Sequence, residues 1–345
     1  MRTFIFAAPK HVKSSERGTP AFGGGGQKTM QEYEVREHQF PSSNGADTVY
    51  AKIYAPKDQR PRGVVQIAHG MAEHIGRYDD FMRFLAVNGF AACGNDHIGH
   101  GRTAPEGGLG YLAARNGFDS LVTDLRLFSI YISGKYPGVP YFLLGHSMGS
   151  FAARLYLARY GGDLAGAVIS GSGASQPLAP AMAAVKKLSG GRGAKKPSKL
   201  LDRLAFGGFN GAVRKPQTPF DWLSRDSRMV ENYIADPYCG FVFSASAFGD
   251  LSTGVYRANK KAAFEGVPKD LPVLMISGDR DPVGDYGRGV RKVYESFRRA
   301  GMEQIELKLY PGGRHEMLNE INKEQVYDDV LQFLQRCLGQ GEGEA

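Results

Sequence analysis

Ser147 lies midway between Gly145 and Gly149, in a glycine-x-serine-x-glycine motif. An apolar run at 141–144 predicts a strand before the motif, and apolar residues at helical spacing over 148–160 predict a helix after it. On such a tight turn the serine hydroxyl projects from the edge of a sheet, and the glycines leave room for the turn. We therefore interpret Ser147 as a nucleophile. The alternative is a glycine-rich turn in which the serine is incidental.

A serine hydroxyl is a weak nucleophile until an imidazole takes its proton, and a carboxylate must hold that imidazole in the correct tautomer. For a serine on a strand-to-helix turn, the expected chain order is serine, acid, histidine. His315 is the one histidine that follows Ser147, and it lies in the loop after a predicted strand at 305–310. We predict His315 as the base; the alternative is a solvated loop histidine.

The acid is expected in the loop after a predicted strand at 274–277, which holds Asp279 and Asp281. Asp281 comes three residues after a glycine and is followed by a proline, which restricts the chain there. We choose Asp281 as the acid. Asp279 is the alternative acid, and its other role would be a hydrogen bond within the turn.

A developing oxyanion requires two preorganised backbone N–H donors. One donor should be the residue after the nucleophile, Met148, and the other should come from the loop after an earlier strand, where Met71 lies. The same loop carries Glu73, His74 and Arg77. These side chains could contact a polar leaving group, or they could form a salt-linked loop.

The segment 96–100 holds one aspartate and two histidines. A catalytic zinc requires a defined third ligand and an open position, and we find no second cluster to complete such a site. We therefore predict a turn at 96–100, and neither a metal nor a cofactor. His146, inside the serine motif, is expected to be packed rather than catalytic.

Strand and helix patterns alternate along most of the chain. Strands are predicted at 32–40, 48–54, 63–68, 90–93, 141–144, 167–170, 274–277 and 305–310. Helices are predicted near 78–87, 119–136, 148–160, 287–300 and 324–338. This alternation favours an α/β fold with a mostly parallel, eight-stranded sheet covered by helices on both faces, and with an antiparallel hairpin at its start.

The alternation stops between the sixth and seventh strands, where Ala-, Lys- and Gly-rich patches and aromatic residues follow one another. This is typical of an inserted helical cap. The glycine run 23–26 and the lack of periodicity before it predict a flexible basic leader. Met30 could be the true start of the protein. The predicted parts are a leader at 1–30, a core at 31–172 and 266–338, a cap at 173–265 and a tail at 339–345.

The 345 residues carry 43 Lys and Arg against 35 Asp and Glu, a net charge of +8. The excess is +4 in 1–30 and +7 in 173–265, whereas 31–172 is neutral. A nucleic-acid-binding domain would concentrate basic residues on the element that docks. We therefore predict no nucleic-acid partner. The basic cap could favour contact with anionic lipid surfaces, with solubility as the alternative.

The sequence has no apolar run long enough for a membrane-spanning helix, and the opening residues do not form a secretion signal. Its three cysteines, Cys93, Cys239 and Cys337, are too sparse for a disulfide framework. We expect them to be small apolar fillers in a protein of the reducing cytoplasm. The oligomeric state remains open.

Four motifs together resemble the monoacylglycerol lipase and lysophospholipase family of α/β-hydrolases, also described as serine aminopeptidase-like hydrolases. The resemblance spans about 30–338 and rests on the segments 69–78, 96–101, 145–149 and 278–281. It implies a triad of Ser147, Asp281 and His315, with oxyanion donors at Met71 and Met148. It also implies action on single-chain acyl glycerols, lysophospholipids and simple esters without a cofactor.

The chain departs from this family in two ways. Ala72 stands where a glycine is common, and the cap is longer and carries the basic run 192–199. Because caps select substrates, the second departure bears on the identity of the substrate.

We predict a serine hydrolase that cleaves carboxylic esters of single acyl chains, of the monoacylglycerol or lysophospholipid type, through an acyl-enzyme on Ser147. The same triad could serve an aminopeptidase or an acyltransferase. A protein of another class would be a non-catalytic binding protein with a hydrolase fold. An epoxide hydrolase or dehalogenase is disfavoured, because Ser147 stands where those reactions need a carboxylate.

Overall fold

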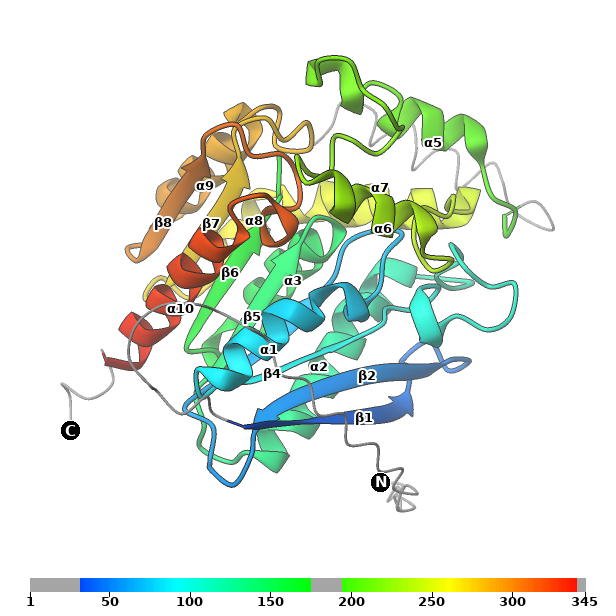
Figure 1. The fold of residues 1–345 in the computed structure, drawn as a ribbon. Coiled ribbons are helices and arrows are strands. Elements are labelled where there is room, and N and C mark those ends of the chain that lie inside the picture. Colours follow the sequence, from blue (N-terminus) through cyan, green and yellow to red (C-terminus); the bar gives the residue numbers. More distant parts are fainter. Residues whose placement is uncertain (1–31, 175–193, 340–345) are drawn as a thin grey trace.

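The computed structural model describes residues 32–174 and 194–339 (Figure 1). The predicted leader with Met30, the start of the basic run 192–199 and the end of the predicted tail lie outside the described residues.

The described chain forms one eight-stranded sheet in the order β1-β2-β4-β3-β5-β6-β7-β8. Its strands are β1 (Tyr33–Pro41), β2 (Thr48–Pro56), β3 (Val64–Ala68), β4 (Ala91–Asn95), β5 (Tyr141–His146), β6 (Gly166–Ser170), β7 (Val273–Gly278) and β8 (Ile305–Tyr310). β1 and β2 pair antiparallel, β2 also pairs antiparallel with β4, and the remaining neighbours pair parallel. The predicted strands, the hairpin and the mostly parallel sheet are confirmed.

Helices follow the strands as the periodicity predicts. The α-helices are α1 (Asp79–Val87), α2 (Gly117–Lys135), α3 (Met148–Tyr160), α5 (Lys199–Phe206), α6 (Ser227–Ala235), α7 (Ala245–Ala258), α8 (Lys261–Glu265), α9 (Arg288–Arg299) and α10 (Lys323–Gly339). Short 3-10 helices are η1 (Ile75–Tyr78), η2 (Gly101–Thr103), η3 (Gly161–Asp163), η4 (Phe209–Ala212) and η5 (Met317–Asn319).

The central strands are apolar on both faces because helices cover both faces. On β5, Leu143 packs in a cluster with α2 and α3, whereas its neighbours Phe142 and Leu144 pack in a second cluster with α1 and α10. The same alternation occurs on β6, where Ile169 joins the first cluster and Val168 the second. Successive side chains of a strand point to opposite faces, so continuous apolar strands supply two core layers.

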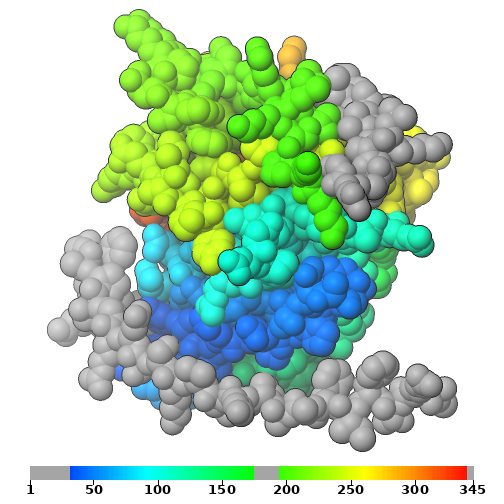
Figure 2. Space-filling model, turned by 90° about the vertical axis from the view of Figure 1, so that its right-hand side faces the viewer, coloured from blue at the N-terminus to red at the C-terminus, as the bar shows by residue number. Residues whose placement is uncertain are grey.

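The segment between β6 and β7 contributes α5 to α8. Helices α5, α6 and α7 lie beyond one end of the sheet, whereas α8 lies beside it (Figure 1). Figure 2 shows its residues as a layer stacked on the first half of the chain. Phe248 and Val255 of α7 and Phe264 of α8 share a hydrophobic cluster with α3. The end of the predicted cap therefore packs directly on a helix of the predicted core, and the division between cap and core stays a prediction.

None of the helices within 32–174 and 194–339 has the length and apolar character needed to cross a bilayer.

Candidate active site

Ser147 lies on the turn between β5 and α3 with φ 52° and ψ −119°, a backbone conformation that residues other than glycine rarely adopt. A methyl group added at Gly145 would overlap the carbonyl oxygen of Gly149, and one added at Gly149 would overlap that of Ala68 at the end of β3. The N–H of Ser147 donates to the carbonyl oxygen of Ser170 at 3.0 Å, which ties the turn to β6. Close backbone packing therefore explains both glycines of the motif.

His315 lies in the loop after β8, and its Nδ1 is 3.0 Å from Oδ1 of Asp281 in the loop after β7. Both side chains are buried. Oδ1 of Asp281 also accepts from the N–H of Val283 at 2.8 Å, and Oδ2 accepts from the hydroxyl of Ser277 at 3.4 Å. The carboxylate is therefore held on both sides while it faces the imidazole.

The two aspartates of this loop have different partners. Asp281 contacts His315, whereas Oδ1 of Asp279 accepts from the N–H of Gly312 at 2.8 Å. The side chain of Asp279 is 41% exposed. The side chain of Asp279 therefore hydrogen-bonds to the loop after β8, neither to His315 nor within its own turn.

The pKa of His315 is set by opposing effects. Burial by itself lowers it, because a buried imidazolium loses its hydration. The charge of Asp281 and its hydrogen bond outweigh burial and raise the pKa of His315 above the usual value, and Glu316 and Glu73 act in the same direction. The environment therefore favours an imidazole that takes up and holds a proton.

The rings of His315 and His146 pack with their centroids 4.7 Å apart. Because His146 precedes Ser147 in the chain, this contact brings the His315 ring to the serine turn. On the other side, a methyl group added at Gly70 would lie 3.2 Å from Cβ of Ser147. The loops after β3 and β8 therefore meet at Ser147. His146 itself is buried, as expected for a packed side chain.

The two predicted oxyanion donors lie on either side of this meeting point. Met148 is the first residue of α3, where a backbone N–H has no acceptor within the helix. Met71 follows Gly70, whose own N–H donates to Oε1 of Glu73 at 2.5 Å. These positions suit two donors that converge on one oxygen, and that role stays a prediction.

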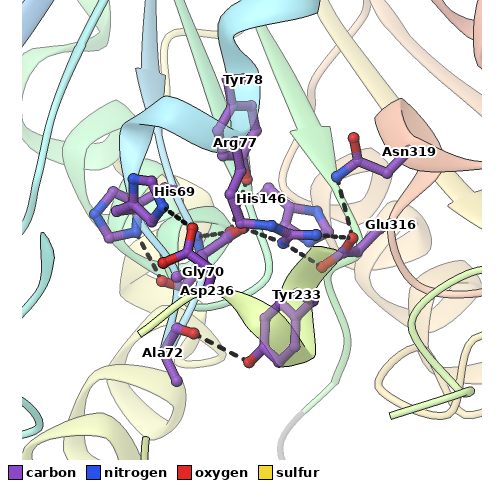
Figure 3. A network of polar contacts seen from close by, with 12 residues as sticks. His69, Gly70, Ala72, Arg77, Tyr78, His146, Tyr233, Asp236, Glu316 and Asn319 are labelled. Carbon is purple, nitrogen blue, oxygen red and sulfur yellow. Dashed lines mark hydrogen bonds and ion pairs between the residues drawn. The ribbon is translucent and has the colours of Figure 1, made fainter. Parts of the chain in front are cut away.

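Ala72 has φ 53°, in the left-handed region that favours glycine. Its carbonyl oxygen accepts from the hydroxyl of Tyr233 at 3.0 Å (Figure 3). It also accepts from the N–H of Gly240 at 2.9 Å. Both donors belong to the segment between β6 and β7. The departure from the family's glycine is therefore accommodated by contacts that also join this segment to the loop of Met71.

Arg77 lies between two glutamates from distant parts of the chain (Figure 3). Its Nη1 is 2.6 Å from Oε2 of Glu73 and 2.6 Å from Oε1 of Glu316, and its Nη2 donates to Oε2 of Glu316 at 2.7 Å. Burial by itself would raise the pKa of Glu316, but the charge and hydrogen bonds of Arg77 outweigh burial and lower it. Because Glu316 adjoins His315, these ion pairs hold the loops after β3 and β8 together.

Glu73 and Arg77 thus form a salt-linked loop, one of the two arrangements that the sequence allows. Oε1 of Glu73 also accepts from the hydroxyl of Tyr78 at 2.8 Å, so both of its oxygens have partners. A leaving-group contact for Glu73 and Arg77 stays a prediction. Sequence analysis missed Glu316, since its partner is 239 residues away and its one signal is its place next to His315.

Sequence analysis also missed Trp222, which no motif marks. The N–H of His315 donates to the carbonyl oxygen of Trp222 at 3.4 Å, and the two rings pack with centroids 5.0 Å apart. Nearby, Nε of Arg225 pairs with Oε2 of Glu320 at 2.9 Å. The segment between β6 and β7 is therefore attached to the loop that carries His315.

The segment 96–100 forms a buried turn. The carboxylate of Asp96 accepts from the backbone N–H groups of Ile75 at 2.8 Å and Arg102 at 2.7 Å. Nε2 of His97 lies 3.1 Å from the carbonyl oxygen of His69. These contacts fit the predicted turn.

Several known lipases and esterases are similar to this chain. It is 31% identical over 307 residues to a monoacylglycerol lipase of Mycolicibacterium smegmatis, a match that covers 86% of this chain and 96% of that protein. It is 29% identical to human monoglyceride lipase over 266 residues, 76% of this chain and 78% of that protein. Among solved structures, a thermostable carboxyl esterase from Bacillus coagulans in complex with glycerol superposes with a TM-score of 0.83 at 32% identity, covering 88% and 99% of the two chains.

The fold, the site and these similarities define the protein as an α/β-hydrolase, a serine hydrolase that cleaves carboxylic esters. The family described as serine aminopeptidase, S33, matches residues 59–322, and the chain belongs to that family. The family resemblance and fold class expected from the sequence are thereby confirmed.

Replacing Arg77 by methionine should lower the free energy of unfolding by about 3–5 kcal/mol at neutral pH, because two buried carboxylates would lose their shared partner. The pKa of Glu316 is lowered in the fold, so its contribution is present above its unfolded value and is lost as the pH falls. The difference in the free energy of unfolding between the wild type and Arg77→Met should therefore become smaller as the pH falls. Urea denaturation at several pH values measures both effects.

The matched control is Arg36→Met, which removes an exposed ion pair with Glu34. It should change the free energy of unfolding by less than about 1 kcal/mol. Equal losses in the two variants would contradict a stabilising role for the buried pairs.

Proposed function

We propose that the protein hydrolyses carboxylic esters of single acyl chains, of the monoacylglycerol or lysophospholipid type, through an acyl-enzyme on Ser147. His315 serves as the base and Asp281 as the acid that orients it. The observation that carries this proposal is the 3.0 Å contact between Nδ1 of His315 and Oδ1 of Asp281, next to the strained serine turn.

The reaction has two halves. His315 takes the proton of the Ser147 hydroxyl through Nε2 while the serine oxygen attacks the ester carbonyl carbon, and the resulting oxyanion accepts from the N–H groups of Met71 and Met148. When the ester C–O bond breaks, the leaving alcohol takes the proton from His315. Water then attacks the acyl-enzyme, giving its proton to the same imidazole, and the fatty acid leaves as Ser147 regains a proton.

The surroundings of His315 support an apolar acyl group. Trp222 packs on its ring, and Phe206 stacks on Trp222 with centroids 6.4 Å apart. Phe206 also contacts Phe248 of α7 at 6.3 Å between centroids. The monoacylglycerol lipase and monoglyceride lipase similar to this chain support the same substrate class.

The family's description as serine aminopeptidases makes an aminopeptidase the second candidate. A substrate α-ammonium group would need an available carboxylate. Of the acidic groups nearest the proposed base, Glu73 and Glu316 share Arg77, and Glu316 also accepts from Asn319 at 3.0 Å. Ester hydrolysis is therefore the better-supported reaction.

Replacing Ser147 by alanine should abolish both hydrolysis of glycerol monoesters and covalent labelling by a fluorophosphonate, because the attacking oxygen is removed. Mass spectrometry of the digested wild-type protein should find the label on the peptide that contains Ser147. Ser296→Ala, at a site on α9, is the control and should label fully.

Full activity in Ser147→Ala would overturn the assignment, whereas ligand binding without turnover in the wild type would favour a non-catalytic binding protein. A series of monoacylglycerols, lysophospholipids and aminoacyl amides, assayed side by side, separates the substrate classes. Hydrolysis of the amides alone would favour the aminopeptidase.

The value of kcat/KM should rise with pH through a midpoint above about 6.5, the ordinary histidine value, because the pKa of His315 is raised and its neutral form is the base. Asp281→Asn should lower that pKa, as an NMR titration of the imidazole would show, and reduce kcat by roughly 10⁴-fold. Asp279→Asn is the matched control from the same loop and should leave the pKa of His315 and kcat nearly unchanged. A larger loss of kcat in Asp279→Asn than in Asp281→Asn would assign the role of the acid to Asp279.

We also propose that α5 contacts lipid surfaces. Its Leu200 and Leu204 lie one helical turn apart and are 69% and 55% exposed. Lys199 and Arg203 flank them, and each cation near an anionic membrane contributes about 1 kcal/mol to the free energy of membrane binding.

The three cysteines are unpaired, which supports the expected cytoplasmic location.

The double variant Leu200→Ser/Leu204→Ser should slow hydrolysis of a monoacylglycerol held in anionic vesicles and leave hydrolysis of a short soluble ester unchanged. Ile130→Ser, an exposed apolar residue on α2, is the control and should alter neither. Added salt should weaken wild-type activity on anionic vesicles more than on neutral ones. The same salt dependence on both would contradict surface contact through charge.

A further inference from the structure

We propose that His74, Asp236 and Cys239 form a binding site for one zinc ion, which departs from the expectation from the sequence of no metal and of a filler role for Cys239. His74 lies in the loop between β3 and η1, and the other two residues follow α6 in the segment between β6 and β7. The proposed ester hydrolysis uses none of the three: His74, which the sequence offered as a leaving-group contact, pairs with Asp236.

The three side chains already lie together. Nε2 of His74 is 2.8 Å from Oδ2 of Asp236, and a ligand atom of each residue, including Sγ of Cys239, lies within 4.8 Å of the others. The ligands of a tetrahedral zinc ion lie about 3.3–3.8 Å apart, from bond lengths of about 2.0–2.3 Å. A contraction of roughly 1 Å among half-buried loop side chains would therefore complete the site.

The donor set favours zinc over the hard cations. Imidazole nitrogen, carboxylate oxygen and thiolate sulfur are the ligands that zinc takes in proteins, whereas magnesium and calcium prefer oxygen alone. With three protein ligands, the fourth position would be open to water. The charges nearby also suit a cation, because Glu73 and Glu316 together exceed the single charge of Arg77, with which both are paired.

Binding requires specific proton movements. The N–H of Gly76 donates to Nδ1 of His74 at 3.2 Å, so the proton of the neutral ring lies on Nε2, toward Asp236. Zinc would take the place of that proton on Nε2. The proton would move to Nδ1, and the 3.2 Å hydrogen bond from Gly76 would be lost. The thiol of Cys239 would lose its proton to solvent, so one proton is released per zinc bound.

The site would join two parts of the chain that are already in contact. Next to His74, the carbonyl oxygen of Ala72 accepts from Gly240 and Tyr233, and Figure 3 shows Asp236 near the same contacts. Zinc would add a bond across this junction, which links the loop of the proposed oxyanion donor Met71 to the segment that covers the site. Zinc should therefore stabilise the folded protein.

Titration of the full chain with zinc, in competition with a chromophoric chelator and in the presence of a non-thiol reductant, tests the proposal. The wild type should bind one zinc per chain, and zinc should raise its Tm reversibly with EDTA. Each of His74→Asn, Asp236→Asn and Cys239→Ser should weaken binding by at least about tenfold, the loss that even an outer-shell substitution causes.

The two asparagine variants keep the hydrogen bonds to the backbone, whereas His74→Asn removes the bond between His74 and Asp236. Asparagine at 74 can still accept from Gly76, and asparagine at 236 can still accept from the N–H of Tyr238, as Oδ1 of Asp236 does at 2.8 Å. Cys337→Ser, in α10, is the thiol control and should bind zinc as the wild type does. Wild-type affinity in Cys239→Ser, or no zinc bound by the wild type at equimolar concentration, would overturn the proposal.

Discussion

The backbone turn at Ser147 is the constraint on which the rest of the site depends. Its positive φ costs on the order of 1–3 kcal/mol and persists because three strands hold it. Gly149 packs against the carbonyl oxygen of Ala68 at the end of β3, and the N–H of Ser147 bonds to Ser170 at the end of β6. A turn held in this way presents the serine at the edge of the sheet, where the loops after β3, β7 and β8 converge.

Two arginines, Arg77 and Arg154, attach the surrounding loops by different means. Arg77 is neutralised by carboxylates and joins the loops after β3 and β8. Arg154 of α3 donates instead to the carbonyl oxygens of Gly173 at 3.1 Å and Ala258 at 2.6 Å, and burial lowers its pKa to about 9. Gly173 lies where the chain leaves β6, and Ala258 lies where it returns toward β7. One residue of the helix that begins at the serine turn therefore anchors both ends of the segment that covers the site.

Local patterns account for the parts of the structure that could be predicted. A buried parallel strand is apolar throughout, so short runs such as 141–144 and 274–277 were recognisable without knowledge of their neighbours. The glycine-serine motif was recognisable for the same reason, since a tight turn demands glycine at fixed offsets. Contacts across long chain separations leave no such pattern. The pairing of Arg77 with Glu316 and the packing of Trp222 on His315 depend on how whole loops are brought together.

The sequence by itself determined the α/β-hydrolase class, the order of strands and helices and the small set of residues able to do chemistry, because each of these is specified by residue types over a few positions. The tertiary structure decided which aspartate meets His315, which charges neutralise one another, and how the segment between β6 and β7 is fastened over the site. Asp279 and Asp281 are two residues apart and chemically identical, and the path of the loop after β8 distinguishes them. The residues able to take part in catalysis could be assigned from short stretches of chain. Their contacts had to come from the fold, because the partners of a side chain belong to distant segments.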